Sequence, residues 1–205
     1  MKLNRVETLW INLDSAKTNR VAMQRQFKTM GFTNAKRVPA RVIAPPEGYN
    51  PAFGKHFVGC AQSHIDCFEQ GSLPLLILED DAKVTAHYRN ELTIPSDADA
   101  IYLGWSRANQ AMRVWDYDRD LVRVAGVNTT HAILYLTAEY KDYACKVTKH
   151  CAYEVKMPLD IGFAGIQDRF KVYATRRPYF VQSEERTSEN KWEAITSGVL
   201  HANCL

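Results

Sequence analysis

Three consecutive carboxylates close an apolar stretch of the chain and are its clearest sign of chemistry. Residues 73–78 are apolar, and Glu79, Asp80 and Asp81 follow them directly. An apolar run of this length indicates a buried strand, and ligands of open α/β sheets bind at the carboxyl ends of strands. Carboxylates held close together repel one another unless a cation neutralises them, and oxygen ligands suit Mg²⁺ or Mn²⁺. The sequence therefore predicts a divalent-cation site, of the kind that usually serves a phosphate.

The side-chain directions decide which of these acids would bind the cation. Side chains alternate along an extended chain, so Glu79 and Asp81 are expected to share a face while Asp80 points away. Glu79 and Asp81 are therefore the better pair of metal ligands. A plainer interpretation stays open, in which the acids only cap the segment that follows, since Asp and Glu are common at helix N-termini.

Strands and helices are expected to alternate around this acidic strand. The predicted strands cover residues 8–13, 35–43, 73–81, 100–104, 121–124, 132–136, 172–175 and 179–182, and the predicted helices cover residues 16–30, 58–69 and 138–149. Val21, Phe27 and Met30 are placed on the inner face of the first helix, which Gly31 should end. Pro39 favours an edge position for the second strand. Such alternation predicts an α/β fold with a mainly parallel central sheet flanked by helices.

The composition is that of one globular domain over residues 1–205, with a polar C-terminal tail from about residue 184. Hydrophobic residues make up 46% of the chain and charged residues 24%, which is ordinary for a soluble protein. The five cysteines form no CxxC pair, which argues against a disulfide framework and favours a reducing, cytoplasmic setting. No signal peptide or membrane span is expected. The net charge of +3 suits an anionic partner without establishing nucleic-acid binding.

Several short islands follow one another in an order that resembles a known enzyme family. They are residues 10–14 (WINLD) with Arg20 downstream, 59–64 (GCAQSH), 78–81 (LEDD), 102–104 (YLG), 130–136 (THAILYL) and 158–160 (PLD). This order resembles glycosyltransferase family 25, which contains lipooligosaccharide galactosyltransferases and collagen-type glycosyltransferases. The most specific part is the Gly-Cys-x-x-Ser-His island, whose histidine precedes Glu79 by fifteen residues. The resemblance extends from residue 8 to about residue 182.

The resemblance implies a GT-A type nucleotide-sugar fold and inverting transfer of a sugar from a UDP-sugar to an acceptor hydroxyl. It also implies a divalent cation, Mn²⁺ or Mg²⁺, held by a DxD-like motif. Carried onto this chain, that motif is Glu79-Asp80-Asp81, with Asp80 among the residues that contact the donor. The chain departs from the family at residues 15–18, where Ser-Ala-Lys-Thr replaces the usual basic cluster. It also has Leu159-Asp160-Ile161 where the family tends to place a more aromatic acidic motif.

The residues that follow the first strand are candidates for binding the nucleotide. Asn12, Leu13 and Asp14 leave the strand where a base or ribose would lie in this architecture. Arg20 is the nearest equivalent of the family's basic cluster and could pair with an anionic group. A position on a solvated helix face is the alternative for Arg20.

Two histidines are candidates for the catalytic site. His64, on the predicted helix with the donor-site candidates Gly59 and Ser63, could contact the diphosphate or orient a ligand carboxylate. The alternative is a structural, hydrogen-bonded core histidine. His131 precedes an apolar strand and could line the acceptor pocket or only hydrogen-bond to a backbone carbonyl.

Inverting transfer needs a carboxylate that takes the proton from the acceptor hydroxyl. Asp160 is the candidate for this base. The alternative is that Asp160 only caps a turn after Pro158. Asp168, Glu184 and Glu185 are its rivals.

The leading hypothesis is a metal-dependent glycosyltransferase that uses a UDP-sugar and acts on a glycan or another hydroxyl-bearing acceptor. The basic clusters at residues 36–41 and 176–177 keep a DNA-base glycosyltransferase of viral type open, although solvated charges explain them equally well. A non-catalytic carbohydrate- or nucleotide-binding module is a further alternative, against which the three clustered acids argue. A phosphotransferase or nuclease would usually carry more acidic ligands or a GxxxxGK[ST] loop, which this chain lacks.

Overall fold

The computed structural model describes residues 1–50, 56–105 and 112–182, and the predicted polar tail lies outside them. Strands and helices alternate in the first part of the chain. After a short 3-10 helix, η1 Leu3–Arg5, the elements are β1 Glu7–Asn12, α1 Lys17–Met30, β2 Ala35–Pro39, α2 Phe57–Gln70, β3 Leu75–Glu79 and β4 Ala82–Val84. Each predicted element of this region has its counterpart here, and β4 is an additional strand. As predicted, Gly31 ends α1, with a φ of 71° in the left-handed region that glycine adopts without strain.

Short strands and four helical segments make up the remainder of the described chain. They are β5 Ala100–Tyr102, β6 Arg113–Asp116, β7 Leu121–Ala125, β8 Ala132–Tyr135, α3 Ala138–Lys149, η3 His150–Val155, α4 Leu159–Ile166, η4 Gln167–Arg169, β9 Val172–Thr175 and β10 Phe180–Gln182. The sequence patterns did not predict β4, β6 or α4. The first two are only three and four residues long, and α4 is too short to show a helical period.

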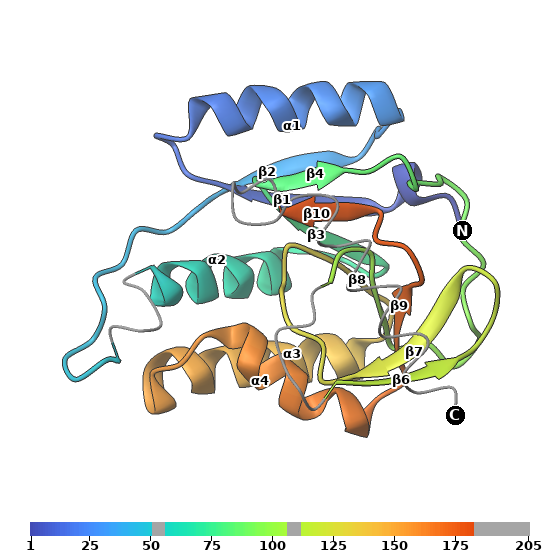
Figure 1. The fold of residues 1–205 in the computed structure, drawn as a ribbon. Helices are drawn as coiled ribbons and strands as arrows, with labels where there is room; N and C mark the ends of the chain where they lie inside the picture. Colours follow the sequence, from blue (N-terminus) through green and yellow to red (C-terminus); the bar gives the residue numbers. More distant parts are fainter. Residues whose placement is uncertain (51–55, 106–111, 183–205) are drawn as a thin grey trace.

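Eight of the strands form one sheet in the order β2-β1-β3-β8-β5-β9-β7-β6, and β4 pairs separately with β10 (Figure 1). The α/β class and the central sheet flanked by helices are confirmed. The sheet is mixed: β1 is parallel to β2 and β3, and β5 is parallel to β9, whereas β8 runs antiparallel to both β3 and β5. The edge position that Pro39 favours for β2 is confirmed by this strand order.

Helices cover both faces of the sheet, with α1 on one face and α2, α3 and α4 on the other (Figure 1). Two cores result, because successive side chains of a strand point to opposite faces. In β1, Leu9 and Ile11 face the core beneath α2, while Trp10 faces the core beneath α1. From α1, Met23 and Phe27 supply the buried face, whereas Val21 is 55% exposed.

The inner-face position predicted for Val21 is therefore wrong. In a helix with 3.6 residues per turn, Met23 and Phe27 are four positions apart and share one face, and Val21 lies off that face.

No helix in the described part of the chain is long and apolar enough to cross a membrane. The four cysteines within the described residues, Cys60, Cys67, Cys145 and Cys151, are free thiols.

Candidate functional site

Three segments that carry the predicted site residues meet at one edge of the sheet. β1 and β3 are parallel neighbours, with Ile11 beside Glu79, so the segments that follow both strands leave the same edge. The antiparallel strand β8 begins at this edge, since Ala132 pairs with Leu78. Residues 12–14, 79–81 and 130–131 therefore come together, although they are far apart in the sequence.

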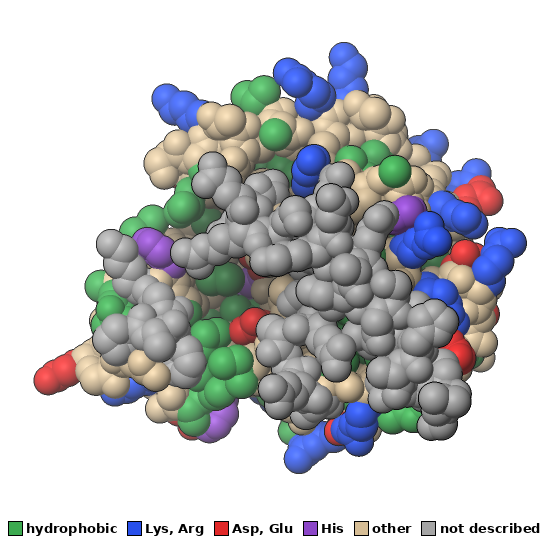
Figure 2. Space-filling view, viewed as in Figure 1, with side chains coloured by type: hydrophobic (Ala, Val, Ile, Leu, Met, Phe, Trp, Pro, Cys, Tyr) green, Lys and Arg blue, Asp and Glu red, His purple; other side chains and the backbone are tan. Residues whose placement is uncertain are grey.

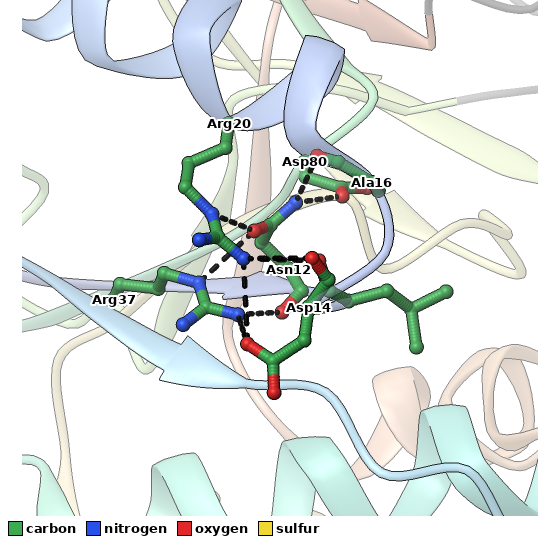
Figure 3. Close-up of polar contacts among 7 residues, drawn as sticks. Asn12, Asp14, Ala16, Arg20, Arg37 and Asp80 are labelled. Atoms are coloured by element: carbon green, nitrogen blue, oxygen red, sulfur yellow. Dashed lines mark hydrogen bonds and ion pairs between the residues drawn. The ribbon is translucent and has the colours of Figure 1, made fainter.

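Asn12 is the centre of a polar network at this edge (Figure 3). Its side-chain nitrogen donates to Asp80 Oδ2 at 2.5 Å and to the carbonyl oxygen of Ala16 at 3.1 Å. Its side-chain oxygen accepts from Arg20 Nε at 2.9 Å and from Arg37 Nε at 3.0 Å. The buried amide thus uses its full bonding capacity, which fixes the orientation of Asp80 and of both arginines.

Two guanidinium groups converge on the exposed carboxylate of Asp14. Arg37 and Arg20 both form ion pairs with Asp14 Oδ1, the latter at 3.3 Å. The hydrogen bond and charge of Arg37, with a smaller contribution from Arg20, lower the pKa of Asp14. The side chains of Arg20 and Arg37 are 29% and 23% exposed, so both remain accessible to an anionic ligand. Leu13 was predicted to contact the donor substrate. Its carbonyl oxygen accepts a hydrogen bond from Arg20 Nη2 at 3.4 Å.

Sequence reasoning did not identify Arg37 as a residue of this site. Arg37 lies on β2, where it pairs in register with Trp10 of β1, which places it next to the exit of the first strand. In the sequence it appears only as part of the basic cluster at residues 36–41. The parallel pairing of β1 with β2 was the signal that could have identified it.

Glu79 is anchored by two side-chain donors. Its Oε1 atom accepts a hydrogen bond from Thr130 Oγ1 at 2.6 Å and lies 3.1 Å from His64 Nε2. Burial favours a raised pKa for Glu79, but the hydrogen bonds and positive charge from His64, with the bond from Thr130, outweigh it and lower that pKa. Glu79 is therefore an ionised carboxylate in a fixed orientation. His64 is fully buried, and its Nδ1 atom has no hydrogen-bond partner among the described residues.

The thiol of Cys60 lies within 4.8 Å of a carboxylate oxygen of Glu79, and the charges of Asp160 and Asp81 also act on it. Burial, followed by the charges of Glu79, Asp160 and Asp81, raises the pKa of Cys60 well above its usual value. Asp81 itself accepts a hydrogen bond from Gln182 Nε2 at 3.2 Å, which ties it to the end of β10. The site thus unites acids from β3, the turn after β3, and α4.

The donors whose spacing suits a bound cation are Cys60, His64 and Glu79, single ligand atoms of which lie within 4.8 Å of one another. Among the described residues, Asp81 belongs to no such group, so its role as a ligand beside Glu79 stays a prediction. Carboxylate oxygens of the kind that Glu79 offers are the ligands that Mg²⁺ and Mn²⁺ prefer. Within the described residues, no lysine or arginine forms an ion pair with Glu79 or Asp160, so the site has no internal cation of that kind.

Asp160 lies in the first turn of α4 and is partly buried. Its Oδ1 atom accepts a hydrogen bond from the backbone N–H of Ile161 at 3.0 Å, and its carboxylate also accepts from the backbone N–H of Thr129. Burial is the main cause that raises the pKa of Asp160, and the charge of Glu79 adds to it. A raised pKa suits a carboxylate that accepts a proton near neutral pH.

The backbone just before Thr130, the residue that donates a hydrogen bond to Glu79, is strained. Thr129 has a φ of 78°, a conformation that is costly for a β-branched residue. Thr129 Oγ1 and the neighbouring Asn128 Oδ1 are buried, with no hydrogen-bond partner among the residues described. Strained backbone and unpaired buried polar atoms are typical of ligand sites.

The remaining predicted site residues have contacts that need no ligand. Ser63 Oγ accepts from the backbone N–H of Arg41 at 2.9 Å and donates to the Gly59 carbonyl at 2.6 Å. A Cβ at Gly59 would come within 2.4 Å of the Arg41 carbonyl oxygen. Both residues therefore pack α2 against the chain that follows β2.

His131 is fully buried, with its Nε2 atom 3.2 Å from the carbonyl oxygen of Phe180. Burial lowers its pKa, which keeps the ring neutral. Of the rival bases, Asp168 pairs with Arg113 on the edge strand β6, and Glu184 and Glu185 lie outside the described residues.

Comparisons with known proteins give structural likenesses, and no match to a family model or a curated sequence. Among solved structures, the chain is similar to one described as a glycosyltransferase involved in the glycosylation of the major capsid of PBCV-1, with a TM-score of 0.36 and 11% sequence identity. The likeness covers 93% of this chain and 98% of the other. At this TM-score the likeness carries no argument about function.

Proposed function

We propose that the chain is a cation-dependent glycosyltransferase of the GT-A type, which moves a sugar with inversion from a UDP-sugar to a hydroxyl of a glycan or related polymer. The observation that carries this proposal is the fixed, ionised carboxylate of Glu79 at the carboxyl edge of the parallel strands, with Asp81 two residues further on and Asp160 near enough for its charge to interact with that of Glu79. The family 25 resemblance of the sequence islands points to the same chemistry.

Glu79 and Asp81 are the residues that would hold the cation. When bound, the cation would supply positive charge that offsets the charge developing on the leaving diphosphate. His64 and Thr130 hold Glu79 ionised and in place for this task. Gln182 holds Asp81 in place through a hydrogen bond.

Arg20 and Arg37 would orient the nucleotide half of the donor. Their guanidinium groups are fixed by Asn12 and face the exposed carboxylate of Asp14. An anionic or hydroxyl-bearing group of the donor can accept hydrogen bonds there, because each guanidinium carries more donors than these contacts use.

Asp160 would take the proton from the acceptor hydroxyl. It comes from α4, whereas the proposed cation ligands come from the end of β3 and the turn after it. Inverting displacement requires the base and the leaving diphosphate on opposite sides of the sugar, so the proposal assigns Asp160 to the acceptor side and the cation ligands to the donor side. Burial raises the pKa of Asp160 and so makes it a stronger base at neutral pH.

A screen of UDP-sugars with Mn²⁺ tests the proposal. Mass spectrometry should detect UDP release for one or more donors, and chelation of the metal should stop it. The Asp81→Asn variant should keep its fold, because the amide oxygen still accepts from Gln182, but should lose both Mn²⁺ binding and turnover.

Asp142→Asn, at an exposed position on α3, is the matched control and should behave as the wild type. Full Mn²⁺-dependent activity of the Asp81→Asn variant would refute the ligand assignment. The absence of UDP release from every donor tested would argue against the transferase itself.

A further inference from the structure

A second polar cavity, separate from the carboxylate site, lies among the loops that follow β4, join β6 to β7 and join β9 to β10. Its volume is about 460 Å³, within the range of small-molecule sites. Its lining includes four arginines, Arg89, Arg119, Arg176 and Arg177, and the single carboxylate of Asp120. Figure 2 shows a corresponding gathering of Lys and Arg side chains with a His side chain on the right of the view.

The charges that line this arginine pocket are only partly balanced within the described chain. Arg176 pairs with Asp116 at 2.7 Å and donates to the Asp118 carbonyl at 2.8 Å, so its role is to hold the β6–β7 hairpin. Asp120 lies 3.5 Å from both Arg89 and Arg119 and offsets one of their charges. Arg177 is exposed and forms no hydrogen bond or ion pair with the described residues. Two positive charges are left over.

A phosphate monoester carries close to two negative charges at neutral pH, and guanidinium groups bind its oxygens in pairs. Tyr88 also lines the pocket, and its buried hydroxyl has no hydrogen-bond partner among the described residues. Burial, with the neighbouring Tyr179, raises the pKa of Tyr88 to about 12, so its hydroxyl keeps its proton. The charge, the donors and the volume all suit one phosphorylated small group.

The β4–β10 ribbon connects this pocket rigidly to the proposed catalytic site. Asp81 and Gln182 lie at one end of the ribbon, and Val84 pairs with Phe180 at the other. Beyond that end, Thr85 bonds to the carbonyl oxygens of Tyr179 at 2.9 Å and Pro178 at 2.7 Å, at the entrance to the loop that carries Arg177. A three-residue strand spans roughly 7 Å, so the two sites lie within reach of one acceptor molecule.

We propose that the arginine pocket binds a phosphate monoester carried by the acceptor sugar. The inference rests on the proposed function in one respect, the identification of the ligand as an acceptor sugar. The affinity for phosphate is a property of the pocket alone. A nucleic acid fits the pocket less well, because duplex DNA is bound through cations spaced along its backbone, whereas these arginines line one cavity between three loops.

Calorimetric titration of the metal-free protein with glucose 6-phosphate tests this proposal without any need for transferase activity. Glucose is the neutral control, and inorganic phosphate shows how much of the affinity comes from the phosphate alone. Arg177→Ala and Arg89→Ala should each weaken glucose 6-phosphate binding about tenfold or more, since a charged hydrogen bond contributes about 1.5–3 kcal/mol. Lys36→Ala, on β2 and away from the pocket, should have no effect.

Asp120→Asn gives a change of opposite sign. It removes the only carboxylate that lines the pocket, so glucose 6-phosphate should bind several-fold more tightly, a result that misfolding cannot produce. Three outcomes would overturn the proposal: no saturable binding of glucose 6-phosphate, affinities that the arginine variants leave unchanged, or weaker binding by Asp120→Asn. Arginine-dependent binding of duplex DNA in place of glucose 6-phosphate would assign the pocket to a nucleic acid instead.

Discussion

Asp160 is the proposed base and is also a partly buried carboxyl with a raised pKa. Its replacement should therefore slow catalysis but increase stability at neutral pH. Replacement by Asn removes the proposed base and should slow sugar transfer by about 10²- to 10⁴-fold, while UDP-sugar binding, measured by calorimetry, stays unchanged. Near-normal turnover would move the base to another residue. The amide still accepts the backbone hydrogen bond from Ile161, so the local fold should persist.

The stability of the same variant should depend on pH in a defined direction. Because the folded state raises the pKa of Asp160, ionisation of this carboxyl costs stability as the pH rises above the value in the unfolded chain, about 3.9. Asp160→Asn should therefore unfold at a higher urea concentration than the wild type at neutral pH. This advantage should disappear as the pH falls towards about 4. A variant less stable than the wild type at neutral pH would contradict this.

Thr130 is the residue that shows whether the orientation of Glu79 matters for stability. Thr130→Val removes the 2.6 Å hydrogen bond to Glu79 and should lower the free energy of unfolding by about 1.5–3 kcal/mol at neutral pH. The loss should shrink as the pH falls below 4.5, because the lowered pKa of Glu79 gives stability only while the carboxylate is ionised. Thr130→Ser keeps the hydroxyl and is the control, and urea titration at several pH values is the measurement.

At the scale of elements, the contact between α2 and the chain after β2 leaves no room for a side chain at Gly59. An Ala Cβ there would lie 2.4 Å from a backbone oxygen, so Gly59→Ala should lower the free energy of unfolding by about 1–3 kcal/mol. Gly165 in α4 is the matched control, since a Cβ there meets nothing within 4 Å. Gly165→Ala should be neutral or stabilising by up to about 1 kcal/mol. Equal urea midpoints for the two variants would contradict the packing role of Gly59.

The helix α4 decides the composition of the site more than any other element. It places Asp160 near Glu79, and its short length concealed it in the sequence. The β4–β10 ribbon has a similar role for Asp81, through Gln182. Both elements join residues that are about 80 to 100 positions apart in the chain, which local sequence patterns cannot reveal.

For the whole molecule, the distribution of charge matters more than the net charge of +3. Arg37, Arg41 and Arg176 all lie in internal ion pairs, so the basic clusters of the sequence do not form a continuous cationic face. We expect no saturable binding of duplex DNA at about 0.15 M salt, measured by fluorescence anisotropy. Binding that falls steeply with added salt would favour the DNA-base alternative. The cytoplasmic setting stays a prediction.

The local order of apolar and polar residues was sufficient to predict much of the fold. The apolar runs predicted β1, β3 and β8, Gly31 predicted the end of α1, and Pro39 predicted an edge strand, because each of these depends on neighbouring residues alone. The same local signals placed Glu79, Asp80 and Asp81 at a strand end. They also misplaced Val21, because packing on one helix face depends on what lies opposite.

By itself, the sequence determined that carboxylates would stand at the carboxyl end of a buried strand, since strand formation and side-chain type are local properties. Only the tertiary structure decided which side chains surround them. The pairing of β1 with β2 brought Arg37 to Asn12, and the packing of α2 and α4 brought Cys60 and Asp160 towards Glu79. These neighbours result from long-range packing, and their charges and burial in turn set the pKa values on which the proposed chemistry depends.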